Sequence, residues 1–183
     1  MQSPNTAERL EALARLLDPP DFDYRDRLAE LSEALTASEH PSAILLERLG
    51  NALELLDPTE IQELHLKTFD LAPACIPYLS VHLFGEESFR RSQLMVGLHE
   101  AYERIGHETH GELPDHLGVV LDSLDRLTAE EAIDLHRFAL IPALLKMRSG
   151  LEKTGNPYRY LLGAIELYLL HEFGPAEGED AAP

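Results

Sequence analysis

Residues 57–69 read DPTEIQELHLKTF and carry a clear signal for the start of a helix. Asp57 is a good N-cap, Pro58 needs no backbone donor in a first turn, and Glu60 stands where a capping box places its acid. Apolar residues at helical spacing follow as far as Phe69. This stretch therefore predicts a helix that starts after Asp57 and ends near Phe69.

Apolar residues recur at helical spacing along almost the whole chain, and no sustained strand-like alternation is present. Thr128 and Glu131 form a second predicted capping box, Gly106 is typical of a helix end, and Asn156-Pro157 is typical of a helix start. Pro142 predicts a kink in a helix that begins near Ile133. The pattern predicts an all-α protein with about eight or more helices.

The segment Leu71 to Phe84 contains Pro73 and Pro77 and predicts a short connection followed by a short helix, with Pro77 in its first turn. The 183 residues are enough for one domain with a core that needs no disulfide. We expect a single compact helical domain over residues 1–174 and a disordered acidic tail over residues 175–183.

The charge balance points to a basic partner. Fifteen Lys and Arg against 33 Asp and Glu give a formal net charge of −18, which disfavours binding to nucleic acid or anionic lipid and favours a cationic peptide or protein. The single cysteine, Cys75, excludes an intrachain disulfide and a four-thiolate metal site. Residues 1–10 lack a secretion signal and no apolar run is long enough to span a bilayer, so a cytoplasmic location is expected.

Catalytic signatures are missing from the sequence. It has no glycine-rich phosphate loop, no nucleophile elbow and no HExxH helix. Cys75 lies in an apolar run, where burial would make its thiol inert. The cluster of His107, Glu108 and His110, with His116 nearby, is expected to be a group of solvated side chains on a turn. We therefore expect no enzyme activity, no metal site and no cofactor.

Two segments resemble a known family. They are Thr68-Phe69-Asp70-Leu71, continuing to His82-Leu83-Phe84-Gly85-Glu86, and Glu112-Leu113-Pro114-Asp115-His116-Leu117. Their residues and order are similar to those of the nitrate reductase delta subunit family, the NarJ and TorD group of molybdoenzyme assembly chaperones. Within this group the motifs resemble the NarJ-like members more. Asn156-Pro157-Tyr158 also fits, and the resemblance spans roughly Leu45 to Phe173. His65 departs from the pattern, in which a Tyr often stands four residues before the Phe.

The resemblance implies a TorD-like/NarJ helical fold and a chaperone, monomeric or homodimeric. It would hold the N-terminal, arginine-containing peptide of a molybdoenzyme catalytic subunit while the molybdenum cofactor is inserted. The residues implied for peptide binding are Phe69, Asp70, His82, Glu112, Pro114, Asp115, His116 and Asp122. Among them Asp115 would receive an arginine or another peptide donor, and His116 would donate to a peptide carbonyl or carry charge at slightly acid pH.

Each of these residues also has a local structural interpretation. Phe69 at a helix end is expected in the core, and Asp70 can cap the next turn. Pro114 and Asp115 are typical of the first turn of a helix, where an acid faces the positive end of the dipole. Local sequence assigns no structural role to His116.

Between Glu112 and Asp134 the chain has seven acids and a single base, Arg126. This band is interpreted as an acidic rim for a basic helical peptide, since arginine pairs with carboxylates through two parallel hydrogen bonds. The alternative is a solvated face of two helices. Two other functions stay open: a helical adaptor that binds a folded surface, and, as a distant third, a small metalloenzyme.

Overall fold

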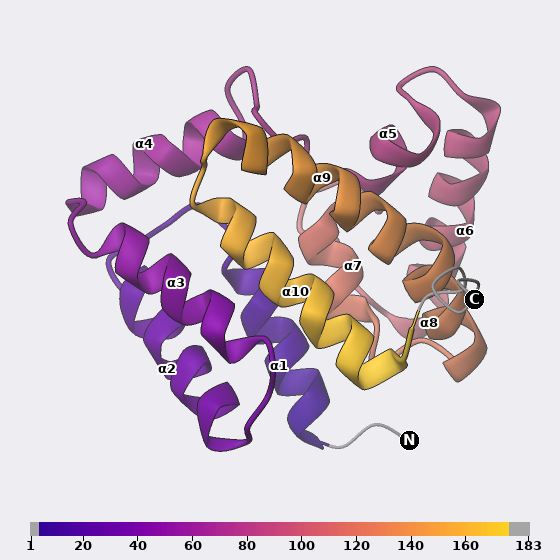
Figure 1. Cartoon of the computed structure of the whole chain (residues 1–183). Helices are drawn as coiled ribbons and strands as arrows, with labels where there is room; N and C mark the ends of the chain where they lie inside the picture. Colours follow the sequence, from indigo (N-terminus) through magenta and orange to yellow (C-terminus); the bar gives the residue numbers. More distant parts are fainter. Residues whose placement is uncertain (1–3, 176–183) are drawn as a thin grey trace, which may run out of the picture.

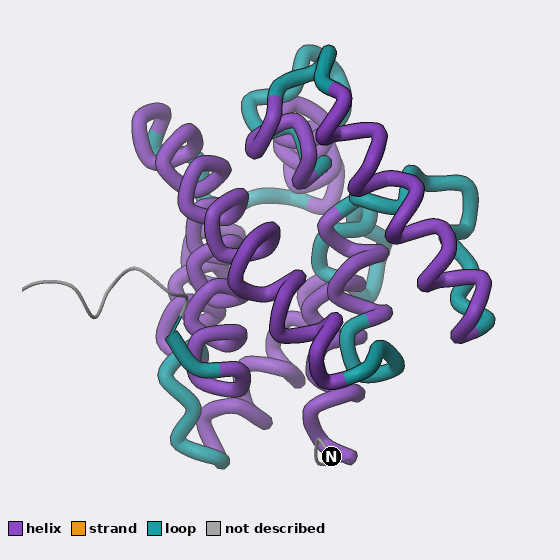
Figure 2. Tube along the Cα trace, turned by 90° about the vertical axis from the view of Figure 1, so that its right-hand side faces the viewer, coloured by secondary structure: helices purple, strands orange, loops and turns teal. Residues whose placement is uncertain are grey.

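The structure is a computed structural model that describes residues 4–175, and it is all-helical within that range, as predicted (Figure 1). The first half contains α1 (Pro4–Arg15), α2 (Tyr24–Ala37), α3 (Ala43–Leu53), α4 (Pro58–Phe69) and α5 (Leu79–Phe84). The second half contains α6 (Phe89–Ile105), α7 (Leu117–Ser123), α8 (Ala129–Leu135), a π-helical segment (His136–Leu140), α9 (Ile141–Thr154) and α10 (Tyr158–Phe173). Seen from the side, the described chain consists of helices joined by loops, without a strand (Figure 2). The acidic tail expected from residue 175 lies outside the described residues, apart from Pro175.

Helix α10 lies at the centre and packs against α3 and α9 (Figure 1). Its sequence is apolar nearly all round, as expected of a helix surrounded by protein, and Leu161, Leu162, Ile165 and Leu169 are fully buried. Gly163 permits a close approach to α3, because a Cβ there would lie 3.0 Å from Cδ1 of Leu45. The buried apolar side chains from α1 to α10 form one continuous core.

Several predicted helix boundaries are confirmed. Asp57 and Glu60 form both halves of a capping box at α4, and Thr128 and Glu131 do the same at α8. Gly106 ends α6 with a left-handed φ of 64°, a conformation that costs a residue without a Cβ little.

The helix expected to kink at Pro142 contains a π-helical segment just before that residue. The amide of Ile141 donates to the carbonyl of His136, five residues back. Because Pro142 has no N–H and its ring crowds the carbonyl four residues earlier, the preceding turn widens instead of breaking.

Two prolines stand outside the helices that they were predicted to open. Helix α5 starts at Leu79, two residues after Pro77, and α7 starts at Leu117, three residues after Pro114. The first-turn prediction is therefore wrong at both places, although the short connection followed by a short helix at Leu71 to Phe84 is confirmed. Both prolines lie in loop segments whose backbones pair with other parts of the chain, as described below.

Cys75 is buried, as predicted, and burial raises the pKa of its thiol to about 12. A thiol with this pKa holds its proton at neutral pH and is a poor nucleophile. Within residues 4–175, no helix combines the length and the apolar character needed to cross a bilayer.

Candidate functional site

The two motif segments, about thirty residues apart in sequence, lie side by side. The amide of Leu79 donates to the carbonyl of Asp115 at 3.0 Å, and the amide of Leu117 donates to the carbonyl of Pro77 at 2.8 Å. These bonds form an isolated antiparallel bridge between Tyr78 and His116. The fold thus fixes the starts of α5 and α7 against each other.

Asp115 is fully buried beneath this bridge. Its Oδ2 accepts a 3.1 Å hydrogen bond from the amide of Ser80, in the first turn of α5, and another from the Ser80 hydroxyl. The hydroxyl oxygen in turn accepts from Nε of Arg91 at 2.9 Å. The expectation that Asp115 receives an arginine from a peptide does not fit this position, because the carboxylate is turned inward and caps α5.

His116 has the structural role that the local sequence did not reveal. It is the N-cap of α7, and its Nδ1 accepts from the amide of Gly118 at 3.2 Å. With Nδ1 acting as acceptor, the neutral ring carries its proton on Nε2, which is then a donor. The carbonyl of Pro114 accepts from the Tyr102 hydroxyl at 2.9 Å, so this segment is held on both sides.

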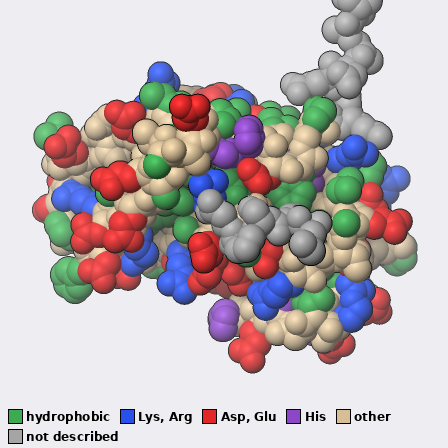
Figure 3. All heavy atoms as spheres, turned by 90° about the horizontal axis from the view of Figure 1, so that it is seen from below, with side chains coloured by type: hydrophobic (Ala, Val, Ile, Leu, Met, Phe, Trp, Pro, Cys, Tyr) green, Lys and Arg blue, Asp and Glu red, His purple; other side chains and the backbone are tan. Residues whose placement is uncertain are grey.

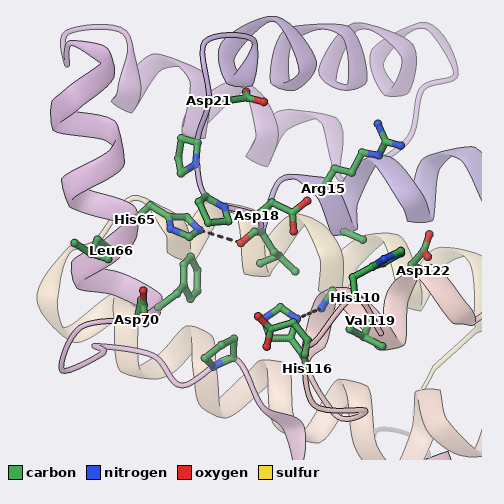
Figure 4. Close-up of a pocket in the computed structure, with 18 of the residues that line it drawn as sticks. Arg15, Asp18, Asp21, His65, Leu66, Asp70, His110, His116, Val119 and Asp122 are labelled. Atoms are coloured by element: carbon green, nitrogen blue, oxygen red, sulfur yellow. Dashed lines mark hydrogen bonds between the residues drawn. The ribbon is translucent and has the colours of Figure 1, made fainter. Parts of the chain in front are cut away.

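Beside the paired segments lies a cavity of about 970 Å³ (Figure 4). Its walls come from the end of α1, the α1–α2 connection, α4, the loop after α6 and the start of α7. Five of the eight residues implied by the family resemblance line it: Phe69, Asp70, Glu112, His116 and Asp122. Pro114, Asp115 and His82 do not. His82 lies on α5, where its Nε2 contacts the carbonyl of Ile76 at 2.7 Å.

The His65 and Phe69 rings line the cavity and pack against the buried ring of Tyr158. The His65 ring lies 5.2 Å from the Phe69 ring and 5.7 Å from the Tyr158 ring, centroid to centroid. Nε2 of His65 lies 2.9 Å from the carbonyl of Leu17, a hydrogen bond that ties α4 to the end of α1 (Figure 4). The imidazole thus takes part in ring packing at the position where the family often has a Tyr.

The cavity lining is strongly acidic. It includes eight carboxylates, from Glu11, Asp18, Asp21, Glu63, Asp70, Glu108, Glu112 and Asp122, and two arginines. Both arginines are already paired, Arg15 with Glu11 and Arg27 with Asp21, each at 2.7 Å. The cavity therefore offers several carboxylates to a cationic ligand and little positive charge to repel it.

Most of the acids predicted to form a rim do not line the cavity. Of the seven acids between Glu112 and Asp134, only Glu112 and Asp122 line the cavity. Glu131 caps α8 and accepts two 2.7 Å hydrogen bonds from Arg104. Asp and Glu side chains also occur in several groups on the face seen from below, with Lys and Arg between them (Figure 3). Acidic side chains are thus spread over the surface. In the cavity they lie beside apolar side chains in a concave site.

Sequence reasoning missed the contribution of the α1–α2 connection. The residues predicted for peptide binding include none from Asp18-Pro19-Pro20-Asp21, yet all four of these residues line the cavity. Acids that flank prolines in a rigid loop were the available signal. Partial burial raises the pKa of Asp18, an effect that the nearby His116 and Arg27 offset in part.

His107, expected on a solvated turn, is buried instead. Its ring meets the Tyr102 ring edge-on at 4.9 Å, and its Nε2 lies 3.2 Å from the carbonyl of Val119. It joins α6 to α7. His110 is exposed, as expected, at a positive φ of 52°.

Acidification is expected to destabilise this protein. Burial is the main cause that lowers the pKa of five histidines below the ordinary value of 6.5: His40, His65, His107, His116 and His136. Below about pH 6.5 the unfolded chain therefore binds more protons than the folded chain, until the pH passes the lowered folded-state values. The free energy of unfolding should begin to fall between pH 7.5 and 6.5, where the unfolded histidines start to bind protons, and fall more steeply from there to pH 5.5.

Urea unfolding at pH 7.5, 6.5 and 5.5 measures this effect. His116→Asn keeps a side-chain acceptor for the Gly118 amide and removes one titrating group, so its loss of stability on acidification should be smaller. A parent chain that is as stable at pH 5.5 as at pH 7.5 would contradict the assignment of these histidines as buried neutral groups.

Comparison with known proteins shows the family to which the chain belongs. The family model described as nitrate reductase delta subunit matches residues 18–160, a range that holds both motif segments and most of the cavity walls. The chain belongs to the nitrate reductase delta subunit family. Two relatives are named nitrate reductase molybdenum cofactor assembly chaperone NarJ, from Escherichia coli strain K12 and from Escherichia coli O157:H7. Each is 35% identical over 161 residues, which cover 85% of this chain and 67% of the relative.

Membership of the nitrate reductase delta subunit family accounts for the two motifs. Their wording resembled the family, and the structure shows the physical link between them: one segment supplies the bridge and Ser80, and the other supplies the buried carboxylate of Asp115. Some motif residues, such as Asp70 and Glu112, line the cavity. Others, such as Asp115, hold the two segments together beside it.

Proposed function

We propose that this protein is a molybdenum cofactor assembly chaperone that works in the cytoplasm. Its client would be the catalytic subunit of a nitrate reductase or a related molybdoenzyme, held by its N-terminal, arginine-containing peptide in the cavity beside α4 and α7. The single observation that carries the proposal is the cavity lining, in which carboxylates outnumber arginines and both arginines are paired. The relatives named as NarJ chaperones support the same function.

The cavity suits a helical peptide with one apolar face. Phe69 and Leu66 of α4, with Pro19 and Val119, supply apolar surface, and the eight carboxylates share the lining with them. A helix laid in such a groove buries its apolar side and leaves arginines at the edge, where carboxylates can accept two hydrogen bonds from each guanidinium.

The residues take different roles in this proposal. Asp70, Glu112 and Asp122 receive peptide arginines, Phe69 contacts the apolar face, and Nε2 of His116 donates to a peptide carbonyl. The remaining three act by positioning: Asp115 caps α5, the Pro114 carbonyl anchors the segment to Tyr102, and His82 joins α5 to the residue before Pro77.

The decisive experiment compares the intact catalytic subunit of nitrate reductase from the same organism with a version that lacks its N-terminal segment. Isothermal titration with the full chaperone chain should show binding of the intact subunit and of the isolated N-terminal peptide, and no binding of the truncated subunit. Equal binding of both subunits would overturn peptide recognition and establish a helical adaptor. Molybdenum content of the enzyme from cells with and without the chaperone then tests cofactor assembly.

A further inference from the structure

A cluster of two histidines and a glutamate lies outside the cavity. His40 stands in the connection between α2 and α3, and His171 and Glu172 lie in the last turn of α10. One ligand atom from each residue lies within 4.8 Å of the others. None of the three lines the cavity proposed for peptide binding.

We propose that His40, His171 and Glu172 bind a divalent transition metal ion, with zinc as the best fit. Two imidazoles and one carboxylate form a ligand set that suits zinc, and three protein ligands leave a fourth position for water. The site would join the end of α10 to the start of α3.

The spacing of the ligand atoms fits tetrahedral coordination. Oε1 of Glu172 lies 3.7 Å from Nε2 of His40 and 3.3 Å from Nδ1 of His171. Zinc bonds of about 2.0–2.1 Å at tetrahedral angles separate ligand atoms by roughly 3.4 Å. The exposed ring of His171 can rotate to close the third side, since more than half of its side-chain surface is free.

His40 supplies an independent observation. Its side chain is only 2% exposed, yet its Nε2 has no hydrogen-bond partner and faces the cluster. A buried polar atom without a partner is costly, and a metal ion would satisfy it.

Hydrogen bonds and ring packing hold His40 and Glu172, two of the three proposed ligands, in place. Nδ1 of His40 lies 2.7 Å from the Ser42 hydroxyl, and the ring stacks on Tyr168 at 4.8 Å. The Thr6 hydroxyl donates to Oε2 of Glu172 at 3.1 Å, which leaves Oε1 for the cluster. Nδ1 also accepts from the Ser42 amide at 3.2 Å, so a metal on Nε2 would exchange that contact for a hydrogen bond that Nδ1–H donates to the Ser42 hydroxyl, the kind of partner that ligating histidines usually have.

The test uses the full chain without an affinity tag, titrated with Zn²⁺ and separately with Co²⁺, whose visible absorption reports tetrahedral coordination. We expect one high-affinity ion per chain and a higher thermal midpoint with Zn²⁺ than with a chelator. His171→Ala and Glu172→Gln should each weaken Zn²⁺ binding by at least about tenfold. Both residues are exposed, so the variants should fold.

His99→Ala is the matched control. His99 and Glu103 also lie 3.3 Å apart on one helix, but the described residues provide no third ligand beside them. This variant should bind Zn²⁺ like the parent. The proposal fails if no ion binds at one per chain, if His171→Ala and Glu172→Gln bind like the parent, or if His99→Ala loses as much affinity as they do. Such a failure would leave peptide binding untouched, since the cavity shares none of these residues.

Discussion

Asp115→Ala should lower the free energy of unfolding by about 2–4 kcal/mol, the cost of leaving buried hydrogen-bond donors without their charged acceptor. The substitution removes the carboxylate that accepts from both the amide and the hydroxyl of Ser80. It also removes the acceptor that orients the Ser80 hydroxyl, whose oxygen accepts from Nε of Arg91. For a chain of this length the thermal midpoint should fall by roughly 5–15 °C, measurable by circular dichroism.

Asp115→Asn and Asp70→Ala complete this experiment. Asparagine keeps an oxygen that can accept from the Ser80 amide, so Asp115→Asn should retain much of the stability and bind the client peptide nearly as the parent does. Asp70 is exposed, and Asp70→Ala should change the unfolding free energy by less than about 0.5 kcal/mol. If Asp115→Ala unfolds like the parent but loses peptide binding, the carboxylate contacts the ligand and the capping role is wrong.

The fold was predictable because its signals are local. The spacing of apolar residues and the caps at Asp57 and Thr128 depend on neighbours within one or two turns, and both caps form as predicted. Pro77 and Pro114 show the limit of such reasoning. Proline suits a first helical turn, but here the backbone pairing between the two segments decides where α5 and α7 begin.

The site was predictable only in part, because its members meet through tertiary contacts. The family resemblance pointed to Asp70, Glu112 and Asp122, which do line the cavity. It could not show that Asp115 is turned inward, since burial of a carboxylate depends on the donor that Ser80 brings from another helix. Nor could it show that the α1–α2 connection closes the cavity, because Asp18 is distant in sequence from both motifs.

Removing carboxylates from the cavity lining should strongly lower the affinity for the client peptide. Asp70→Asn and Glu112→Gln each remove one carboxylate from the lining, and glutamine keeps an acceptor for the Tyr78 hydroxyl, which now donates to Glu112 at 3.1 Å. Charge-assisted hydrogen bonds contribute about 1.5–3 kcal/mol, so each substitution should weaken binding about tenfold and the pair up to about a hundredfold. Titration calorimetry with the N-terminal peptide measures the loss.

Varying the salt concentration and substituting the peptide's arginines tests whether this loss of affinity is electrostatic. Exposed pairs are screened over about 8 Å at physiological ionic strength, so the difference between parent and double variant should shrink as salt rises, while the apolar contribution persists. Changing two peptide arginines to glutamine should cost on the order of 1–3 kcal/mol with the parent and much less with the double variant.

A matched pair of substitutions tests whether peptide affinity depends on the carboxylates in the cavity or on the acidic band as a whole. Glu130→Gln and Asp134→Asn remove the same charge from exposed positions of α8 that do not line the cavity. They should leave peptide affinity within about twofold of the parent, because exposed charges outside the cavity act on the peptide only through a screened field. Equal losses from both pairs would mean that net charge alone attracts the peptide. A loss confined to Asp70 and Glu112 would mean that the peptide lies in the cavity.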